Sequence, residues 1–360
     1  MTPLDPASLE RYRAIGDALA DSAVRALKVS PRRGDNVLAR VREGAARGDP
    51  ALSAFVDETR GAPPWVDTAA IERGRRAVMR HAPLTFLVLL VASIVESFAA
   101  ARGAKVLART GRLERDPENR LYETASMVRD VLLPGAFDEG ASGREALLRV
   151  RLLHAYVRTH VDKSGWDRAH LGVPVNQSDM LHTLLLFSHV LVRGLEALGA
   201  RLSDEEKEGY AALWRYAGWL LGIEPALLPA CCDDERRAYA LVRQAEYAPD
   251  DDSRRLAFAV LRSLANRPPF YLPEEALFAL SRRLLGDELA DAFALPTSRR
   301  WSLAFATLAL GYRGLDAGGR RLPGLDGARR GLGRGFVEVN RARILWRTPG
   351  ADYVFWTAPP

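Results

Sequence analysis

Cysteine is nearly absent from this chain of 360 residues, which holds only Cys231 and Cys232. Because the two are adjacent, they cannot form an ordinary disulfide between separate elements, and they offer no paired CxxC motif for zinc. This cysteine usage is typical of a reducing compartment. The chain also opens without a basic segment followed by an apolar run and a cleavage site, so no export signal is indicated. We therefore expect a cytoplasmic protein.

The sequence also lacks a hydrophobic run long enough to span a membrane. Its longest apolar run, residues 82–95, is interrupted by Glu96 and falls short of the roughly 18 to 20 residues that a spanning helix requires. We interpret it as a buried core helix. The GxSxG, GxxxxGK[ST] and HExxH patterns are missing, and no GxGxxG follows a strand. Any chemistry must therefore use side chains carried by helices.

Positive charge in excess is confined to one segment of the chain. The formal net charge is +6, and residues 313–347 hold nine arginines against Asp316, Asp326 and Glu338, so nine minus three accounts for the whole excess. The segment is rich in glycine and has no nucleic-acid-reading motif with interleaved aromatics, so we do not expect a nucleic-acid partner. A solvated basic tail or a clamp for an anionic group is the simpler interpretation.

Apolar residues recur at spacings of three and four along nearly the whole chain, which predicts an all-α fold. We expect residues 1–75 to form a helical extension wrapped on a core of residues 76–315, and residues 316–360 to form a basic C-terminal extension packed on that core. Asn176 and Ser203 have the spacing of helix N-caps. The helices that we expect from periodicity cover residues 82–107, 119–133, 144–161, 178–198, 204–221, 253–264 and 273–285.

His154 stands in an unusually apolar setting. In RVRLLHAYVRTHV (residues 149–161) it shares one side of a predicted helix with Leu147 and Val157, so its ring points toward the core. A buried imidazole satisfies its nitrogens through hydrogen bonds inside the core, which is the commoner case, or by binding a metal. Arg151 and Arg158 lie about one turn on either side, where they are surface residues or partners for an anionic group.

A second group of polar residues lies on the preceding helix, in NRLYETASMVRD (residues 119–130). Arg120 and Thr124 are four residues apart and share a face, and Glu123 lies within reach of Arg120. The simpler interpretation is a surface ion pair worth a few tenths of a kcal/mol. With Leu121 and Val128 turned inward, the same helix instead places Thr124 and Arg120 at the edge of a core pocket. Two helices facing each other across a slot could then sandwich a flat cofactor.

Several stretches together resemble the MpaB and latex-clearing rubber oxygenase family. They are RTGRL, the RxxxT of Arg120 and Thr124, RLLHAYVR with His154 thirty residues after Thr124, VPVNQSDMLHTLLLFS and WRYAGWLLGIEPALLP. Each stretch is a weak signal alone, but their order and spacing are specific. The resemblance covers residues 82–230, with a looser helical continuation to about residue 311.

This resemblance implies a b-type haem in a globin-like helical core. His154 would be the iron ligand, and Arg120 and Thr124 would lie on the opposite, distal side of the haem. Proteins of this family cleave a carbon–carbon double bond of an isoprenoid-like chain with dioxygen. In that setting Arg151 and Arg158 are candidates to pair with the haem propionates, since guanidinium groups bind carboxylates well.

The sequence departs from its rubber-cleaving relatives at Glu123. Those relatives can carry a lysine there, which occupies the sixth iron position when the pocket is closed, and an acid cannot take that role. Those relatives are also exported, whereas no export signal is indicated in this sequence. This difference argues against a solid polymer as the substrate here. A glutamate serves as general base in relatives. The candidates in this chain are Glu123 and Glu96, which follows the apolar run and is expected to be removed from water.

We therefore predict a haem b-dependent oxygenase that uses dioxygen on an apolar, alkene- or isoprenoid-like substrate, by oxidative cleavage of the double bond. Two alternatives stay open. One is a haem-dependent oxidase, hydroxylase or peroxidase of a small molecule. The other is a cofactor-free helical module that binds a hydrophobic ligand or a partner protein. The oligomeric state is not predicted.

Overall fold

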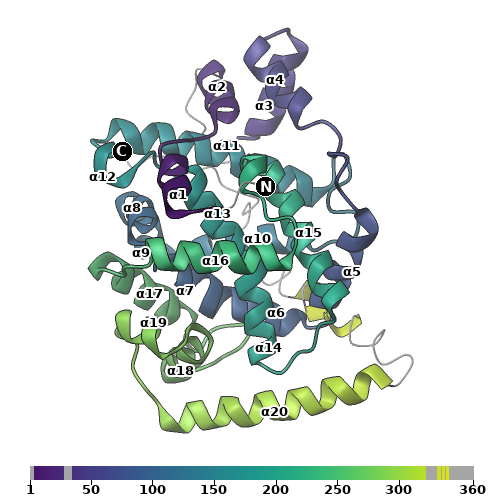
Figure 1. Ribbon diagram of the computed structural model, residues 1–360, viewed down its shortest axis with the longest axis vertical. Helices are drawn as coiled ribbons and strands as arrows, with labels where there is room; N and C mark the ends of the chain where they lie inside the picture. Colours follow the sequence, from purple (N-terminus) through teal and green to yellow (C-terminus); the bar gives the residue numbers. More distant parts are fainter. Residues whose placement is uncertain (1–3, 28–34, 322–330, 334, 337, 340–360) are drawn as a thin grey trace.

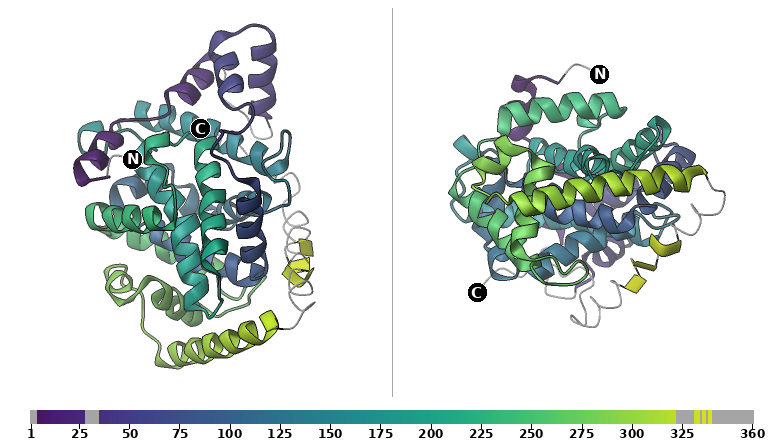
Figure 2. Two further views of the ribbon diagram at one scale, coloured as in Figure 1. Left: turned by 45° about the vertical axis from the view of Figure 1, so that its right-hand side comes forward. Right: turned by 90° about the horizontal axis from the view of Figure 1, so that it is seen from below.

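The computed structural model describes residues 4–27, 35–321, 331–333, 335–336 and 338–339. All regular elements in this part of the chain are helices, and the nearest approach to a strand is one isolated antiparallel bridge between Ala100 and Tyr247. The all-α prediction is therefore confirmed. Figure 1 and Figure 2 show α2, α3 and α4 together at one end of the molecule and the long helix α20 along the opposite end.

Five helices form the described N-terminal residues 4–27 and 35–79, and each begins after a side chain able to cap it. Asp5, Asp17, Asn36, Asp49 and Asp67 each accept a hydrogen bond from a backbone N–H of the first turn, as good N-caps do. The predicted boundary after residue 75 falls inside the fifth of these helices. They are α1 (Pro6–Arg13), α2 (Ala18–Ala26), α3 (Val37–Ala46), α4 (Pro50–Glu58) and α5 (Thr68–Met79).

The core and C-terminal helices follow without a long linker, and Ser203 forms a full capping box with Glu206 at the start of α15. In the core these elements are α6 (Ala82–Val88), η1 (Leu89–Ser93), α7 (Ile94–Ser97), α8 (Ala101–Thr110), α9 (Arg112–Arg115), α10 (Pro117–Val131), α11 (Ser142–Lys163), α12 (Arg168–Leu171), α13 (Gln177–Leu185), η2 (Leu186–Val190), α14 (Leu191–Ala197) and α15 (Asp204–Leu220). After them come η3 (Pro225–Leu227), α16 (Cys232–Glu246), α17 (Asp251–Leu264), α18 (Glu274–Leu285), α19 (Asp287–Ala292) and α20 (Arg299–Arg321).

Two helices that we expected to be continuous are interrupted by π-helical turns. The segments η1 and η2 break residues 82–107 and 178–198 and pack against each other. A π turn changes the hydrogen-bond register of the helix, so some carbonyl groups need donors from other elements. Ser93 Oγ donates to the Leu186 carbonyl at 2.8 Å, and Tyr210 OH donates to the Phe187 carbonyl at 3.0 Å. The second half of the first run also turns at Phe98, so α8 is a separate helix.

The helices α5 and α15 pack with their backbones in close contact. A Cβ atom added at Gly74 would lie 2.0 Å from the Tyr210 nitrogen, and one added at Gly209 would lie 2.2 Å from the Ala70 carbonyl oxygen. Only glycine allows this approach.

Within the described residues, no single helix is long and apolar enough to cross a membrane. The helix α5 and the run Ala82–Ser97 meet the length and hydropathy criteria only when they are taken together, and the two are bent by 87° relative to each other.

The predicted C-terminal extension, residues 316–360, lies mostly outside the described residues. Its first six residues continue α20. Farther on, the ring of Phe336 lies 6.4 Å from that of Phe86 and 6.0 Å from that of Phe270, measured between centroids, so this point of the chain rests on the core. The role that we expected for the arginines of residues 322–347 concerns positions that are for the most part not described.

Candidate active site

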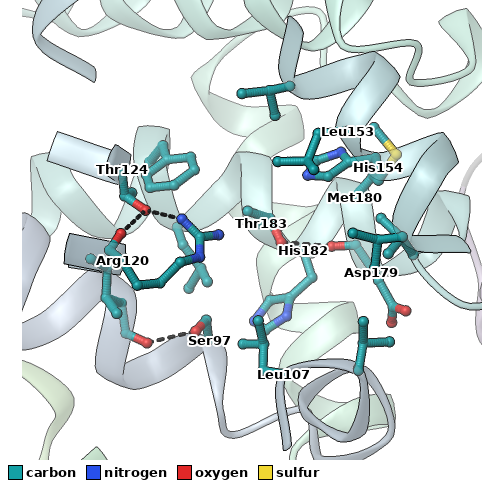
Figure 3. Close-up of a pocket in the computed structure, with 18 of the residues that line it drawn as sticks. Ser97, Leu107, Arg120, Thr124, Leu153, His154, Asp179, Met180, His182 and Thr183 are labelled. Atoms are coloured by element: carbon teal, nitrogen blue, oxygen red, sulfur yellow. Dashed lines mark hydrogen bonds between the residues drawn. The ribbon is translucent and has the colours of Figure 1, made fainter. Parts of the chain in front are cut away.

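A largely apolar cavity of about 290 Å³ lies among α8, α10, α11 and α13 (Figure 3). The structure brings four of the sequence-predicted site residues together on it. Arg120, Glu123 and Thr124 come from α10, and His154 comes from α11. The two helices pack against each other, and both contribute side chains to the lining of the cavity. The apolar part of the lining includes Phe98, Leu107, Leu121, Met127, Leu153, Val157, Met180 and Phe187.

His154 presents a neutral imidazole to this cavity. Burial, reinforced by the positive charges of Arg158 and Arg120, lowers the pKa of His154 to about 3. Its Nδ1 atom is buried and has no hydrogen-bond partner among the described residues. A buried ring nitrogen without a partner is unfavourable in a finished core. The ring therefore has the protonation state that a metal ligand needs, with hydrogen-bonding capacity that the fold does not use.

Arg120 and Thr124 form one hydrogen-bonded unit on the wall formed by α10. Arg120 Nη1 donates to Thr124 Oγ1 at 2.9 Å, and the Thr124 hydroxyl donates to the Arg120 carbonyl at 3.3 Å. The guanidinium points into the pocket in Figure 3, and 34% of the side-chain surface remains accessible. Burial lowers the pKa of Arg120, but a guanidinium stays protonated in proteins. The pocket therefore carries a fixed positive charge.

Glu123 lies on the same wall but is held mainly by a different arginine. It forms an ion pair with Arg112 on α9, and its distance to Arg120 Nη1 is 3.9 Å. Only 14% of its side-chain surface is accessible, so the surface pair that the spacing suggested is in fact a partly buried cluster. Because Arg112 engages the carboxylate, Glu123 leaves the Arg120 guanidinium largely free to act in the pocket.

Arg151 and Arg158 do not line the cavity, and this corrects the expected pairing with propionates. Arg151 donates to Asp17 at 2.6 Å and to Glu58 at 3.1 Å, while Arg158 donates to Asp21 at 2.9 Å. Both arginines are buried. Buried guanidiniums need carboxylate partners, and the N-terminal part of the chain supplies them from positions 93 to 137 residues earlier.

Glu96 is buried as expected, but it lies behind the pocket instead of in it. Its carboxylate accepts hydrogen bonds from Tyr239 and, at 3.0 Å, from Tyr247, and it forms an ion pair with Arg193 at 3.0 Å. The adjacent Ser97 lines the cavity, whereas Glu96 does not. The geometry therefore contradicts the prediction that Glu96 acts directly as a general base on a molecule in the pocket.

Two pocket residues, Asp179 and His182, had no assigned role in the chemistry predicted from sequence. Asp179 receives the expected cap from Asn176 at its backbone N–H, but its carboxylate also lines the cavity and pairs with Arg13 at 3.1 Å. His182 lines the cavity one turn later. The spacing of three residues on α13 was the available signal, because it places both side chains on one helix face.

Comparisons with known proteins identify the family and the fold of this chain. The family described as "ER-bound oxygenase mpaB/B'/Rubber oxygenase, catalytic domain" matches residues 76–314. A rubber oxygenase from Streptomyces sp. (strain K30) is 25% identical over 276 residues, which make up 76% of this chain and 66% of that enzyme. A structure of latex clearing protein LCP in the closed state has a TM-score of 0.68 at 20% identity and covers 93% of this chain and 91% of that one, so the fold is shared. The chain therefore belongs to the family of mpaB/B' and rubber oxygenase catalytic domains.

Proposed function

We propose that this protein is a haem b-dependent oxygenase that uses dioxygen to cleave a carbon–carbon double bond in an apolar substrate. One observation carries the proposal most directly: His154 and the Arg120–Thr124 unit lie on two packed helices that border the same apolar cavity. The family of the chain, whose description names oxygenases, supports the same reaction class.

The residues around the cavity fit a haem. His154 offers a neutral imidazole, and its unpartnered Nδ1 is consistent with a ring whose surroundings are incomplete without a ligand. Arg149, which also lines the cavity, has a buried Nε with no hydrogen-bond partner in the described part of the chain. Its nearest acid is Glu145 at 3.8 Å, so the guanidinium is available for a propionate. Arg149 replaces Arg151 and Arg158 in that proposed role.

The side chains of this protein prepare the pocket for oxidation. A bound haem supplies an iron that binds and activates dioxygen. Arg120 places a fixed positive charge in a site of low polarity, where it stabilises negative charge that develops on oxygen. Thr124 holds the guanidinium in place at 2.9 Å. The apolar side chains exclude water and select an apolar substrate.

The absorption spectrum and an isotope label test this function. We expect the purified protein, or protein incubated with haemin, to show an intense haem band, and we expect a short isoprenoid alkene such as squalene to yield carbonyl products labelled from ¹⁸O₂. Label in a hydroxyl or epoxide product would instead favour a haem-dependent hydroxylase or related oxidase. A preparation that stays colourless with haemin would contradict the proposal and favour a helical module for a hydrophobic ligand or partner.

Replacing Arg120 with methionine tests the positive charge in the pocket. We expect kcat to fall by about 10²- to 10³-fold, the loss typical when one group that stabilises developing charge is removed. The haem band should remain, because the proposed iron ligand is His154 on α11, whereas Arg120 lies on α10. Arg76→Ala, which removes an arginine with 53% of its side chain exposed on α5, is the matched control. Full activity in Arg120→Met would show that the guanidinium has no part in the reaction.

A further inference from the structure

A chain of hydrogen bonds joins the cavity to the buried carboxylate behind it. His182 lines the cavity, as do Ser97 and Leu107, which are labelled with it in Figure 3. Its Nε2 atom is 3.1 Å from the Tyr247 hydroxyl, and that hydroxyl donates to Glu96 Oε1 at 3.0 Å. The three groups come from α13, from the end of α16 and from α7. They are therefore brought together only by the tertiary fold.

The direction of each hydrogen bond in this chain follows from the chemistry of the end group. An ionised carboxylate only accepts, so the Tyr247 hydroxyl hydrogen points at Glu96. The Tyr247 oxygen must then accept from His182, which places a hydrogen on Nε2 of the imidazole. In the neutral ring, Nδ1 consequently holds a lone pair. Within the described residues no hydrogen bond to this Nδ1 is formed.

Glu96 is held by one counter-charge and by hydrogen bonds from two tyrosines. Its side chain is fully buried, and Arg193 balances its charge at 3.0 Å, while Tyr239 provides a further hydrogen bond. Burial and the Glu96 charge hold the pKa of Tyr247 well above its usual range, so the hydroxyl stays protonated. Burial, with a smaller effect of the Arg13 charge, lowers the pKa of His182 to about 3, so its ring is neutral.

The two acids that line the pocket are both engaged by arginines. Glu123 pairs with Arg112, and Asp179 pairs with Arg13 and also accepts from Asn176 at 2.8 Å. Neither carboxylate is placed to take a proton without breaking a buried ion pair, which is unfavourable. The route through His182 leaves these two ion pairs intact and instead ends at Glu96, which pairs with Arg193 at 3.0 Å and accepts from two tyrosine hydroxyls.

We propose that His182 is a catalytic proton-transfer residue of this site and that Tyr247 and Glu96 are its positioning residues. Resting on the proposed oxygenase function, this inference assigns a proton acceptor to the reaction. His182 Nδ1 takes a proton from a group of the substrate in the cavity, Nε2 passes its own proton to the Tyr247 oxygen, and Tyr247 passes its hydroxyl proton to Glu96 Oε1. Three bonds to hydrogen form and three break. The substrate gains the negative charge that Glu96 loses, and the reverse sequence returns the proton.

Three single variants separate this relay from ordinary packing. Tyr247→Phe removes the hydroxyl that connects His182 to Glu96 and keeps the ring. Tyr239→Phe is the matched control, because it removes the other tyrosine hydroxyl from Glu96 without touching the link to His182. His182→Gln removes the transferring group itself. The haem band of each variant reports whether the pocket is intact.

The first readout is the ¹⁵N NMR signal of the His182 ring in the diamagnetic carbon monoxide complex of the ferrous protein. We expect the Nε2–H tautomer in the parent protein and in Tyr239→Phe, and loss of that preference in Tyr247→Phe. The second readout is turnover. We expect kcat to fall by about 10²- to 10⁴-fold in His182→Gln and substantially in Tyr247→Phe, with KM and the haem band unchanged, as for loss of general acid–base catalysis.

The outcomes distinguish this inference from the proposed function. A parent ring protonated at Nδ1, or turnover in Tyr247→Phe equal to that of the parent, would overturn the relay while leaving the oxygenase assignment in place. Equal losses in Tyr239→Phe and Tyr247→Phe would overturn it as well, because only a structural role for Glu96 would remain. An inactive parent protein with the expected tautomer would instead contradict the oxygenase function.

Discussion

Replacing His154 with alanine is expected to remove the haem band of the purified protein and to reduce oxygenase turnover by roughly a hundredfold or more. Loss of a residue that merely orients a metal ligand already costs about 10- to 100-fold, and the ligand itself should cost at least as much. Difference spectroscopy with added haemin measures the affinity, and product formation measures turnover. Because α11 is a long helix packed on α10 and α15, the variant should keep its helical content.

Two measurements guard this result against a simple folding defect. His170→Ala removes a histidine that is 82% exposed and contacts Asp167, so it should leave the haem band unchanged. Free imidazole added to His154→Ala should restore part of the band, because the truncated side chain leaves room beside the cavity. If His154→Ala bound haem with the same spectrum as the parent protein, then His154 would not be the axial ligand.

Replacing Arg151 with alanine is expected to lower the free energy of unfolding by about 3 to 5 kcal/mol, the usual cost of removing one partner of a buried ion pair. Arg151 and Asp17 each expose only 4% of their side-chain surface, so Asp17 would keep a buried, uncompensated charge. The midpoint of urea denaturation, followed by circular dichroism, measures this change. It is large beside the total stability of a typical domain, about 5 to 15 kcal/mol.

Comparison variants show whether the loss comes from the buried charge. Arg151→Met combined with Asp17→Asn removes both charges and should lose less stability than Arg151→Ala alone. Arg168→Ala breaks an exposed pair with Asp162, in which 57% of the arginine side chain is accessible, and should cost at most about 1 kcal/mol. A shifted haem band in Arg151→Ala with unchanged stability would restore the rejected contact with a propionate.

The helical fold could be predicted because its signals are local. The Ser203 capping box and the Asn176 cap can be recognised within four residues of sequence, and both are present. The π-helical turns could not be predicted in this way, since apolar spacing looks the same before and after them. Their carbonyls depend on partners such as Tyr210, which is far away in sequence. Periodicity therefore predicts that a helix exists more reliably than it predicts its continuity.

The site was predictable to the extent that its residues share a helix. Arg120 and Thr124 are four residues apart and meet as the spacing indicates, at 2.9 Å. Which way Arg151 points depends on Asp17, a residue 134 positions away, and no local pattern contains that information. Glu96 was correctly expected to be buried, but its partners Tyr239 and Tyr247 come from a distant helix and its end. Their contacts determine on which side of the wall the carboxylate lies.

The ion pairs between the N-terminal helices and α11 have a consequence for trimmed versions of this protein. A fragment cut to residues 76–314, the span matched by the family, would lose Asp17, Asp21 and Glu58, so Arg151 and Arg158 would lose these carboxylate partners. It would also uncover the face of α11 on which α2 and α3 pack. Exposing this packed face removes its contribution to stability. We therefore expect a fragment limited to the recognised catalytic domain to be less stable than the full chain, and expression work should retain the first helices.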